Sequence, residues 1–199
     1  MKGHRFVLLS ALFLFFCLIS LSPAQAQEWQ IDKNHSNIYF QVRHTFVPVR
    51  GLFKDFSGTI NFDAASQKMH SITFQVQVDS INTNITKRDN HLRSNDFFAA
   101  RQFPQMSFTS SKITPLDNHR YRVQGQLTVR SVTKEVEIEC RFLGMQDNPL
   151  KKGQKVAGFE AEFSINRLDY NVGTGQFAKM GVIGEDVHIL VALELLADM

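Results

Sequence analysis

Apolar and polar residues alternate with a period of two along most of this chain. In NIYFQVRH the side chains of Ile38, Phe40, Val42 and His44 share one face. The same pattern recurs in GTINFD, ITFQVQVDS, YRVQGQLTVR, EVEIECRF, GFEAEFSI and EDVHILVALEL. Period-two alternation is typical of a β-strand with one face toward solvent and the other toward a dry interior. We therefore predict an all-β protein.

A further strand around Met106 to Phe108 brings the predicted total to about eight strands. Short turns such as LDNH at 116–119 separate several of them. Because the strands do not alternate with helices, we expect antiparallel pairing. About eight such strands can close as a barrel that encloses side chains or one small ligand. They can also form a two-sheet sandwich with a filled core, and the period alone does not separate these folds.

The segment RDNHLRSNDFF, residues 88–98, breaks the alternation and predicts a short helix near residues 86–101. Asn84 or Thr86 could cap this helix, and Asp89 and Arg93 stand four residues apart, the spacing of a surface ion pair. Pro104 ends the helix and starts the next strand.

The first 26 residues have the features of a secretory signal peptide. Lys2 and Arg5 precede an apolar run over residues 6–21, and small residues at Ala24 and Ala26 form an A-x-A cleavage site. We expect cleavage after Ala26, which leaves a single domain over residues 27–199. An uncleaved membrane anchor is the alternative, although the apolar run is short for a span of about 20 residues.

Charge and cysteine content narrow the class of protein. Removing Lys2 and Arg5 from the 22 basic residues leaves 20 against 19 acidic ones. Such a balanced chain does not predict nucleic-acid binding. Cys140 is the one cysteine after residue 26, so no disulfide can form within the mature chain and a buried thiol is expected.

The residues suited to catalysis or metal binding form no motif. The chain lacks a G-x-S-x-G elbow, and the mature histidines contain no H-E-x-x-H and no i, i+4 pair on a helix, so we predict no metal site. These histidines are His35, His44, His70, His91, His119 and His188. The glycine-rich stretch YNVGTGQFAKMGVIG is followed by a strand, so it predicts a connection over a barrel rim instead of a phosphate-binding loop.

One acid/base alternative remains open in the helical segment. Asp89, His91 and Asp96 could act as acid and base groups, or they could be solvated charges on a helix that Leu92, Phe97 and Phe98 dock onto the barrel.

The phenylalanine content is compatible with two kinds of interior. Of 18 phenylalanines, four precede residue 27, and the remaining 14 suit either a packed core or a cavity with aromatic walls.

Several sequence blocks, in order, resemble the YceI-like family, also called the polyisoprenoid-binding domain family. They are WQIDKNHSNIYFQVRH at 29–44, GLFKDFSGTINFD at 51–63, SINTNITKRDNHLRSNDFFAARQFPQMSF at 80–108, GQLTVRSVTKEVEI at 125–138 and GFEAEFSINRLDY at 158–170. The resemblance implies an eight-stranded, lipocalin-like antiparallel barrel, export to the periplasm and an elongated pocket for a long isoprenoid or similar amphiphile. It implies no enzymatic activity.

We therefore expect a periplasmic binding or carrier protein for a polyprenol, an isoprenoid quinone or a related lipid, with no other cofactor and His44 near the polar end of the ligand. We also expect the protein to contact a membrane transiently and to form a homodimer. The alternatives are an enzyme acting on such a lipid and a ligand-free structural or stress-response domain. The inward residues expected to bind the ligand are Ile38, Phe40, Val42, His44, Phe62, Phe74, Val76, Val78, Phe108, Leu127, Val129, Ile138, Phe159, Phe163, Val187 and Ile189.

Overall fold

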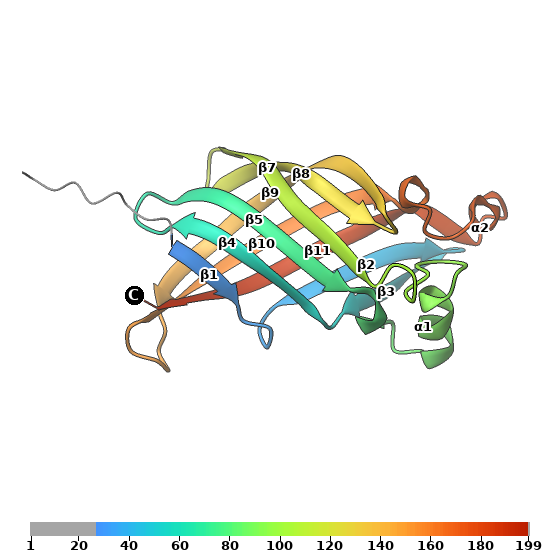
Figure 1. Cartoon of the computed structure of the whole chain (residues 1–199), viewed down its shortest axis with the longest axis horizontal. Helices are drawn as coiled ribbons and strands as arrows, with labels where there is room; N and C mark the ends of the chain where they lie inside the picture. The colour runs from blue at the N-terminus through green and yellow to red at the C-terminus, as the bar shows by residue number, and fades with distance from the viewer. Residues whose placement is uncertain (1–26, 199) are drawn as a thin grey trace, which may run out of the picture.

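The computed structural model describes residues 27–198 (Figure 1). The predicted signal peptide, residues 1–26, lies outside the described residues. The elements in chain order are β1 (Gln27–Ile31), β2 (Asn37–His44), β3 (Val47–Phe53), β4 (Phe56–Asp63), β5 (Lys68–Gln77), the 3₁₀ helix η1 (Val78–Ser80), β6 (Ile81–Asn82), α1 (Thr86–Arg93), β7 (Gln105–Pro115), β8 (Arg120–Val129), β9 (Val132–Asp147), β10 (Gln154–Asn166), η2 (Arg167–Tyr170), α2 (Gly175–Lys179) and β11 (Ile183–Asp198).

The strands close into a single barrel. Each strand pairs in an antiparallel manner with its neighbours in the order β1-β4-β5-β7-β8-β9-β10-β11, and β1 also pairs with β11, which completes a ring of eight. The strands β2 and β3 continue β1 and β4 along the same wall, because β2 pairs with β11 and with β3. The predicted eight-stranded antiparallel barrel is confirmed, and closure excludes the two-sheet sandwich.

The helical elements gather at one end of the barrel. Figure 1 shows α1 and α2 at the end opposite to the C-terminus. The turn between β2 and β3 lies at this end too, because the Thr45 N–H donates to the Val182 carbonyl at 2.8 Å, just after α2. We call this the α1 end. None of the helices among the described residues combines the length and the apolar character that crossing a membrane requires.

The predicted helix is shorter than expected, and its charged side chains form other contacts than those predicted. The helix α1 covers Thr86–Arg93 and is followed by turns, and the residue before it, Ile85, offers no side-chain cap. The expected Asp89–Arg93 pair is wrong. Asp89 is buried and accepts hydrogen bonds from the Thr83 N–H and hydroxyl, whereas Arg93 donates to the Ile81 carbonyl at 2.7 Å. Both side chains bind the segment before α1, and this fixes the helix against the barrel.

The opposite end of the barrel is filled by its own aromatic side chains. The rings of Phe62, Phe142 and Phe159 lie with centroids 5.1–5.2 Å apart, and the Trp29 indole N–H donates to the Phe62 carbonyl at 3.0 Å. Leu195 and Tyr121 belong to the same buried cluster. We call this the closed end. Aromatic packing of this kind stabilises a core beyond the area it removes from water.

Candidate functional site

The barrel encloses a cavity of about 470 Å³ between the closed end and the α1 end. Its walls are almost entirely apolar and come from all the long strands of the ring, and residues of α1, η2 and α2 line it at the α1 end. Ligand sites for small molecules typically measure about 300–1,000 Å³. The interior is therefore filled at the closed end, and a cavity remains between that end and the α1 end.

The structure places most of the residues predicted from alternation in the cavity wall. Those that line it are Ile38, Phe40, Val42, His44, Phe74, Val76, Phe108, Leu127, Val129, Ile138, Phe159, Phe163, Val187 and Ile189. Their participation in ligand binding stays a prediction, because lining a cavity is a matter of position alone.

Two of the predicted residues, Phe62 and Val78, do not line the cavity. Phe62 follows a register shift in β4 and belongs to the closed-end cluster, where neighbouring rings cover it completely. Val78 begins η1 instead of continuing β5, and its N–H donates to the Pro104 carbonyl at 2.9 Å. The chain has left the barrel wall at that point, so the inward alternation no longer applies.

His44 is the last residue of β2 and lines the cavity at the α1 end, with its side chain exposed to solvent. The prediction of a dry-face histidine is therefore wrong in its burial, since the end of the strand protrudes past the enclosed interior. His44 lies where a ligand would meet water.

Glycines on neighbouring strands hold three wall phenylalanines close to the backbone. A Cβ atom on Gly51, Gly58 or Gly125 would come within 2.4–2.8 Å of the ring of Phe40, Phe74 or Phe108, respectively. Real Cβ atoms essentially never approach so closely, so these rings can take their places in the cavity wall only because the neighbouring residues are glycines.

The cavity wall includes basic side chains but no acidic ones among the described residues. Arg88 and His91 of α1 and Arg167 of η2 line it, together with the hydroxyl-bearing Ser107 and Tyr170. Arg167 is only 4% exposed, and burial lowers the pKa of its guanidinium, although Glu185 acts in the opposite direction. Sequence analysis missed Arg167, because nothing in its local pattern indicates that η2 turns it inward.

The acid/base alternative has little geometric support. The Asp89 carboxylate is occupied by Thr83, whereas His91 pairs with Asp96 at 2.9 Å at the surface. Of the three groups, His91 alone lines the cavity. The alternative, that Phe97 and Phe98 dock the helical segment onto the barrel, fits the structure better. Both residues line the cavity, and the ring of Phe97 stacks on that of Phe177 with 5.7 Å between centroids.

Cys140 is buried and lines the cavity from β9. Burial raises the pKa of its thiol to about 12. A thiol so rarely ionised is a poor nucleophile and a poor metal ligand, so Cys140 serves as a small apolar wall residue.

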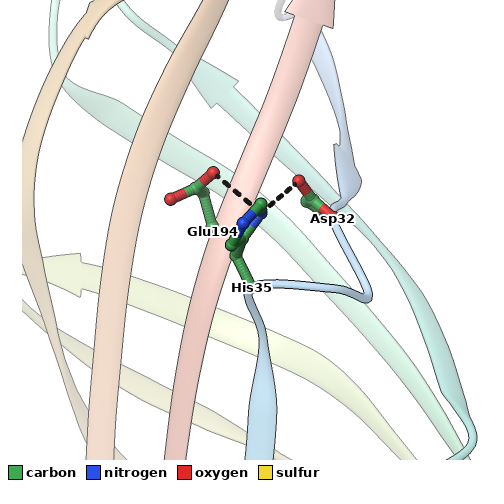
Figure 2. Close-up of side chains that lie close together, drawn as sticks. All are labelled: Asp32, His35 and Glu194. Carbon is green, nitrogen blue, oxygen red and sulfur yellow. Dashed lines mark hydrogen bonds and ion pairs between the residues drawn. The ribbon is translucent and has the colours of Figure 1, made fainter.

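A second cluster lies outside the cavity, where the chain turns between β1 and β2. His35 Nδ1 is 2.8 Å from an Asp32 oxygen and 3.6 Å from a Glu194 oxygen, as Figure 2 shows. Sequence analysis missed this cluster because Glu194 is brought to the turn only by β11. The side chain of Ser36 accepts from the Glu194 N–H at 2.9 Å, so the cluster fastens the turn to β11.

An up-and-down barrel of eight antiparallel strands around an apolar cavity defines the lipocalin-like class of binding barrels. The particular family follows from the sequence. A family model described as the YceI-like domain matches residues 29–195, and the chain belongs to this family. Protein YceI of Escherichia coli O6:H1 is 34% identical over 180 residues, which cover 89% of this chain and 91% of that protein.

Solved structures share the barrel. BcnA of Burkholderia cenocepacia has a TM-score of 0.71 at 26% identity, covering 84% of this chain and 99% of its own. A polyisoprenoid binding domain from Saccharophagus degradans has a TM-score of 0.63 at 17% identity, covering 87% of this chain and 99% of its own. At that identity, the second likeness concerns the fold alone.

Proposed function

We propose that this protein is a periplasmic binding or carrier protein for a long-chain amphiphilic lipid, such as a polyprenol or an isoprenoid quinone. The observation that carries the proposal is the apolar cavity of about 470 Å³ that the barrel's own side chains leave open. Each methylene buried there contributes about 0.8 kcal/mol before the costs of binding. Apolar walls are therefore sufficient to hold a hydrocarbon chain.

Three further observations support the proposal. The fold is shared with a barrel of Saccharophagus degradans that is described as a polyisoprenoid binding domain. The signal-like residues 1–26 favour export. Among the residues that the structure describes, the cavity lining offers no nucleophile beside a general base, which favours binding over catalysis.

The direct test compares two tryptophan substitutions on adjacent residues of β10. Ala161 lines the cavity, whereas Glu162 is exposed. We expect Ala161→Trp to fill the cavity and to lose binding of an added polyprenol or isoprenoid quinone, and Glu162→Trp to bind as the unsubstituted protein does. Circular dichroism and thermal unfolding establish that both variants fold.

Native mass spectrometry and organic extraction of protein purified from its own periplasm identify the ligand. A lipid recovered from the unsubstituted protein and absent from Ala161→Trp supports the proposal. Failure to recover or bind any lipid would overturn it and would favour a ligand-free structural or stress-response role.

Transfer of the ligand from a bilayer forms part of the same proposal. Phe46 is 93% exposed in the β2–β3 turn, and Met180, 63% exposed, follows α2. The hydrogen bond from Thr45 to Val182 joins these two loops beside the α1 end of the cavity. We infer that Phe46 and Met180 insert into a membrane surface during transfer, since exposed apolar residues beside a lipid pocket shorten the ligand's path through water. A homodimer stays a prediction.

A further inference from the structure

The charge of the cavity wall is one-sided. Arg88, Arg167, His44 and His91 line it, and within residues 29–198 no aspartate or glutamate does. A neutral ligand such as a polyprenol would offer no opposite charge to Arg88 and Arg167. The imbalance is therefore informative about the polar end of the ligand.

Arg167 is the more deeply buried of the two arginines. Its guanidinium donates to the backbone carbonyls of Val172 at 2.7 Å, Gly184 at 2.8 Å and Ile183 at 3.4 Å. These bonds fix the group in place, but no carboxylate of the described residues lies within 4.0 Å of it to form an ion pair, and Glu185 acts on it only from a greater distance. A buried charge without a counter-charge is costly, and an anionic ligand would reduce that cost.

Arg88 is half-buried, and a single residue holds it. Its Nε donates to the Thr83 hydroxyl at 2.7 Å and its Nη2 to the Thr83 carbonyl at 2.8 Å. Among the described residues Nη1 makes no hydrogen bond, so its two N–H groups remain for a ligand. The nearby Asp89 binds Thr83 from the other side and forms no ion pair with Arg88.

The two histidines contribute less to this imbalance. His91 already pairs with Asp96 at 2.9 Å, and His44 is exposed. The arginines remain charged at any physiological pH. They are therefore the groups that define the preferred headgroup.

We propose that the ligand carries an anionic headgroup, a carboxylate or a phosphate, that Arg88 and Arg167 bind at the α1 end while the apolar chain extends toward the closed end. The inference rests on the proposed function and narrows it to acidic amphiphiles. A guanidinium presents paired N–H donors that match the oxygens of carboxylates and phosphates, which alcohols and quinone carbonyls do not match.

The test uses four probes with the same hydrocarbon chain and different ends: carboxylate, phosphate, alcohol and trimethylammonium. We expect both acids to bind at least about tenfold more tightly than the alcohol, consistent with hydrogen bonds to charged groups, and the trimethylammonium probe to bind most weakly. The preferred acid then distinguishes a fatty-acid type of ligand from a lipid-phosphate type.

Substitutions at adjacent positions of α1 locate the effect. Arg88→Gln should remove most of the preference for acids, measured as the ratio of the affinities for each acid and for the alcohol, and Arg88→Lys should retain part of that preference. Lys87→Gln is the matched control, because it removes the same charge from an exposed residue outside the cavity wall. Arg88 is chosen over Arg167, whose bonds to three backbone carbonyls are needed to hold the chain after β10.

Equal affinities for the acids and the alcohol would overturn this inference while leaving the proposed function intact. Equal losses in Arg88→Gln and Lys87→Gln would overturn it too, since the preference would then come from overall charge. Absence of binding by all four probes would contradict the proposed function itself.

Discussion

The ring of Phe40 on β2 lies against the backbone of Gly51 on β3, so closely that a methyl group on Gly51 would stand 2.4 Å from the ring. The ring covers the glycine and stays near the wall. The ring could not take this place in the cavity wall if residue 51 carried a side chain.

Replacing Gly51 with alanine should push the Phe40 ring toward the cavity centre. We expect a loss of about 1–3 kcal/mol in the free energy of unfolding, typical of overpacking, and weaker binding of a lipid probe. Urea denaturation and probe titration measure the two effects. Gly175→Ala is the control, because a Cβ there meets no atom within 4 Å. An unchanged affinity in Gly51→Ala would show that this ring does not limit the space for ligand.

Truncating phenylalanines at the two levels of the barrel should have unequal costs. Phe62 is fully buried among other rings, so Phe62→Ala should lower the free energy of unfolding by about 3–5 kcal/mol. Phe163 is half-buried and faces the cavity, where it lacks partners on one side, so Phe163→Ala should cost less than about 2 kcal/mol. Chemical denaturation compares them. Similar losses would indicate that the interior beside Phe163 is filled.

Cys140 should resist thiol reagents in the folded protein. With a pKa of about 12, only about one thiol in ten thousand is ionised at pH 8. We expect no reaction with Ellman's reagent over minutes at that pH in protein that begins at Gln27, and complete reaction in guanidinium chloride. Rapid reaction without denaturant would show that water and the reagent reach β9 through the cavity.

The cluster at the β1–β2 turn predicts a pH-dependent stability. The hydrogen bond between His35 and Asp32 raises the pKa of His35 and lowers that of Asp32. The histidine's contribution is complete below its ordinary pKa of 6.5 and is lost as the pH rises through its higher folded value. The aspartate's contribution is present above 3.8 and is lost as the pH falls through its lower folded value.

His35→Gln should therefore destabilise the protein most between about pH 4 and pH 6.5, and the difference should shrink at pH 8. Urea denaturation midpoints of the variant and the unsubstituted protein, at about pH 5.5 and about pH 8, measure this difference in stability. His188→Gln is a suitable control, because His188 bonds to the Ser164 hydroxyl at 2.7 Å instead of a carboxylate. A constant difference across this range would contradict the ion-pair account.

Membrane contact should depend on Phe46. We expect Phe46→Ser to reduce co-flotation with phosphatidylethanolamine–phosphatidylglycerol vesicles and to slow uptake of a vesicle-borne quinone, without changing affinity for detergent-dispersed quinone. Leu150, 94% exposed in the β9–β10 turn, lies beyond the closed end, so Leu150→Ser is the matched control. Equal effects of the two substitutions would indicate nonspecific adsorption.

Alternation was sufficient to predict antiparallel strands with one wet and one dry face, because this is a property of consecutive residues, but the choice of a barrel over a sandwich came from the resemblance to the YceI-like family. It also placed Phe40, Phe74 and Phe163 in the cavity wall correctly. It failed where the chain leaves the wall, as at Val78, and where the barrel is filled by its own rings, as at Phe62. Both errors depend on the position along the barrel axis, which a period of two does not encode.

The groups that lie beside the apolar wall were harder to predict. Arg167 turns inward because η2 folds the chain back over the barrel, and Glu194 meets His35 across 159 positions of sequence. The turn between β1 and β2 was not predicted, although the Asn34 N–H donates to the Asp32 carboxylate there at 2.9 Å. Contacts of this kind come from tertiary closure and have no local signature.

The aromatic rings at the closed end impose an order of events on any occupant. With the headgroup at the α1 end, as we propose, a hydrocarbon enters the barrel tail first and leaves it head first. The charged or polar tip is thus the last part to go in and the first to come out, so a recipient always meets the tip before the chain. Transfer of the ligand therefore depends on the groups that bind its polar end.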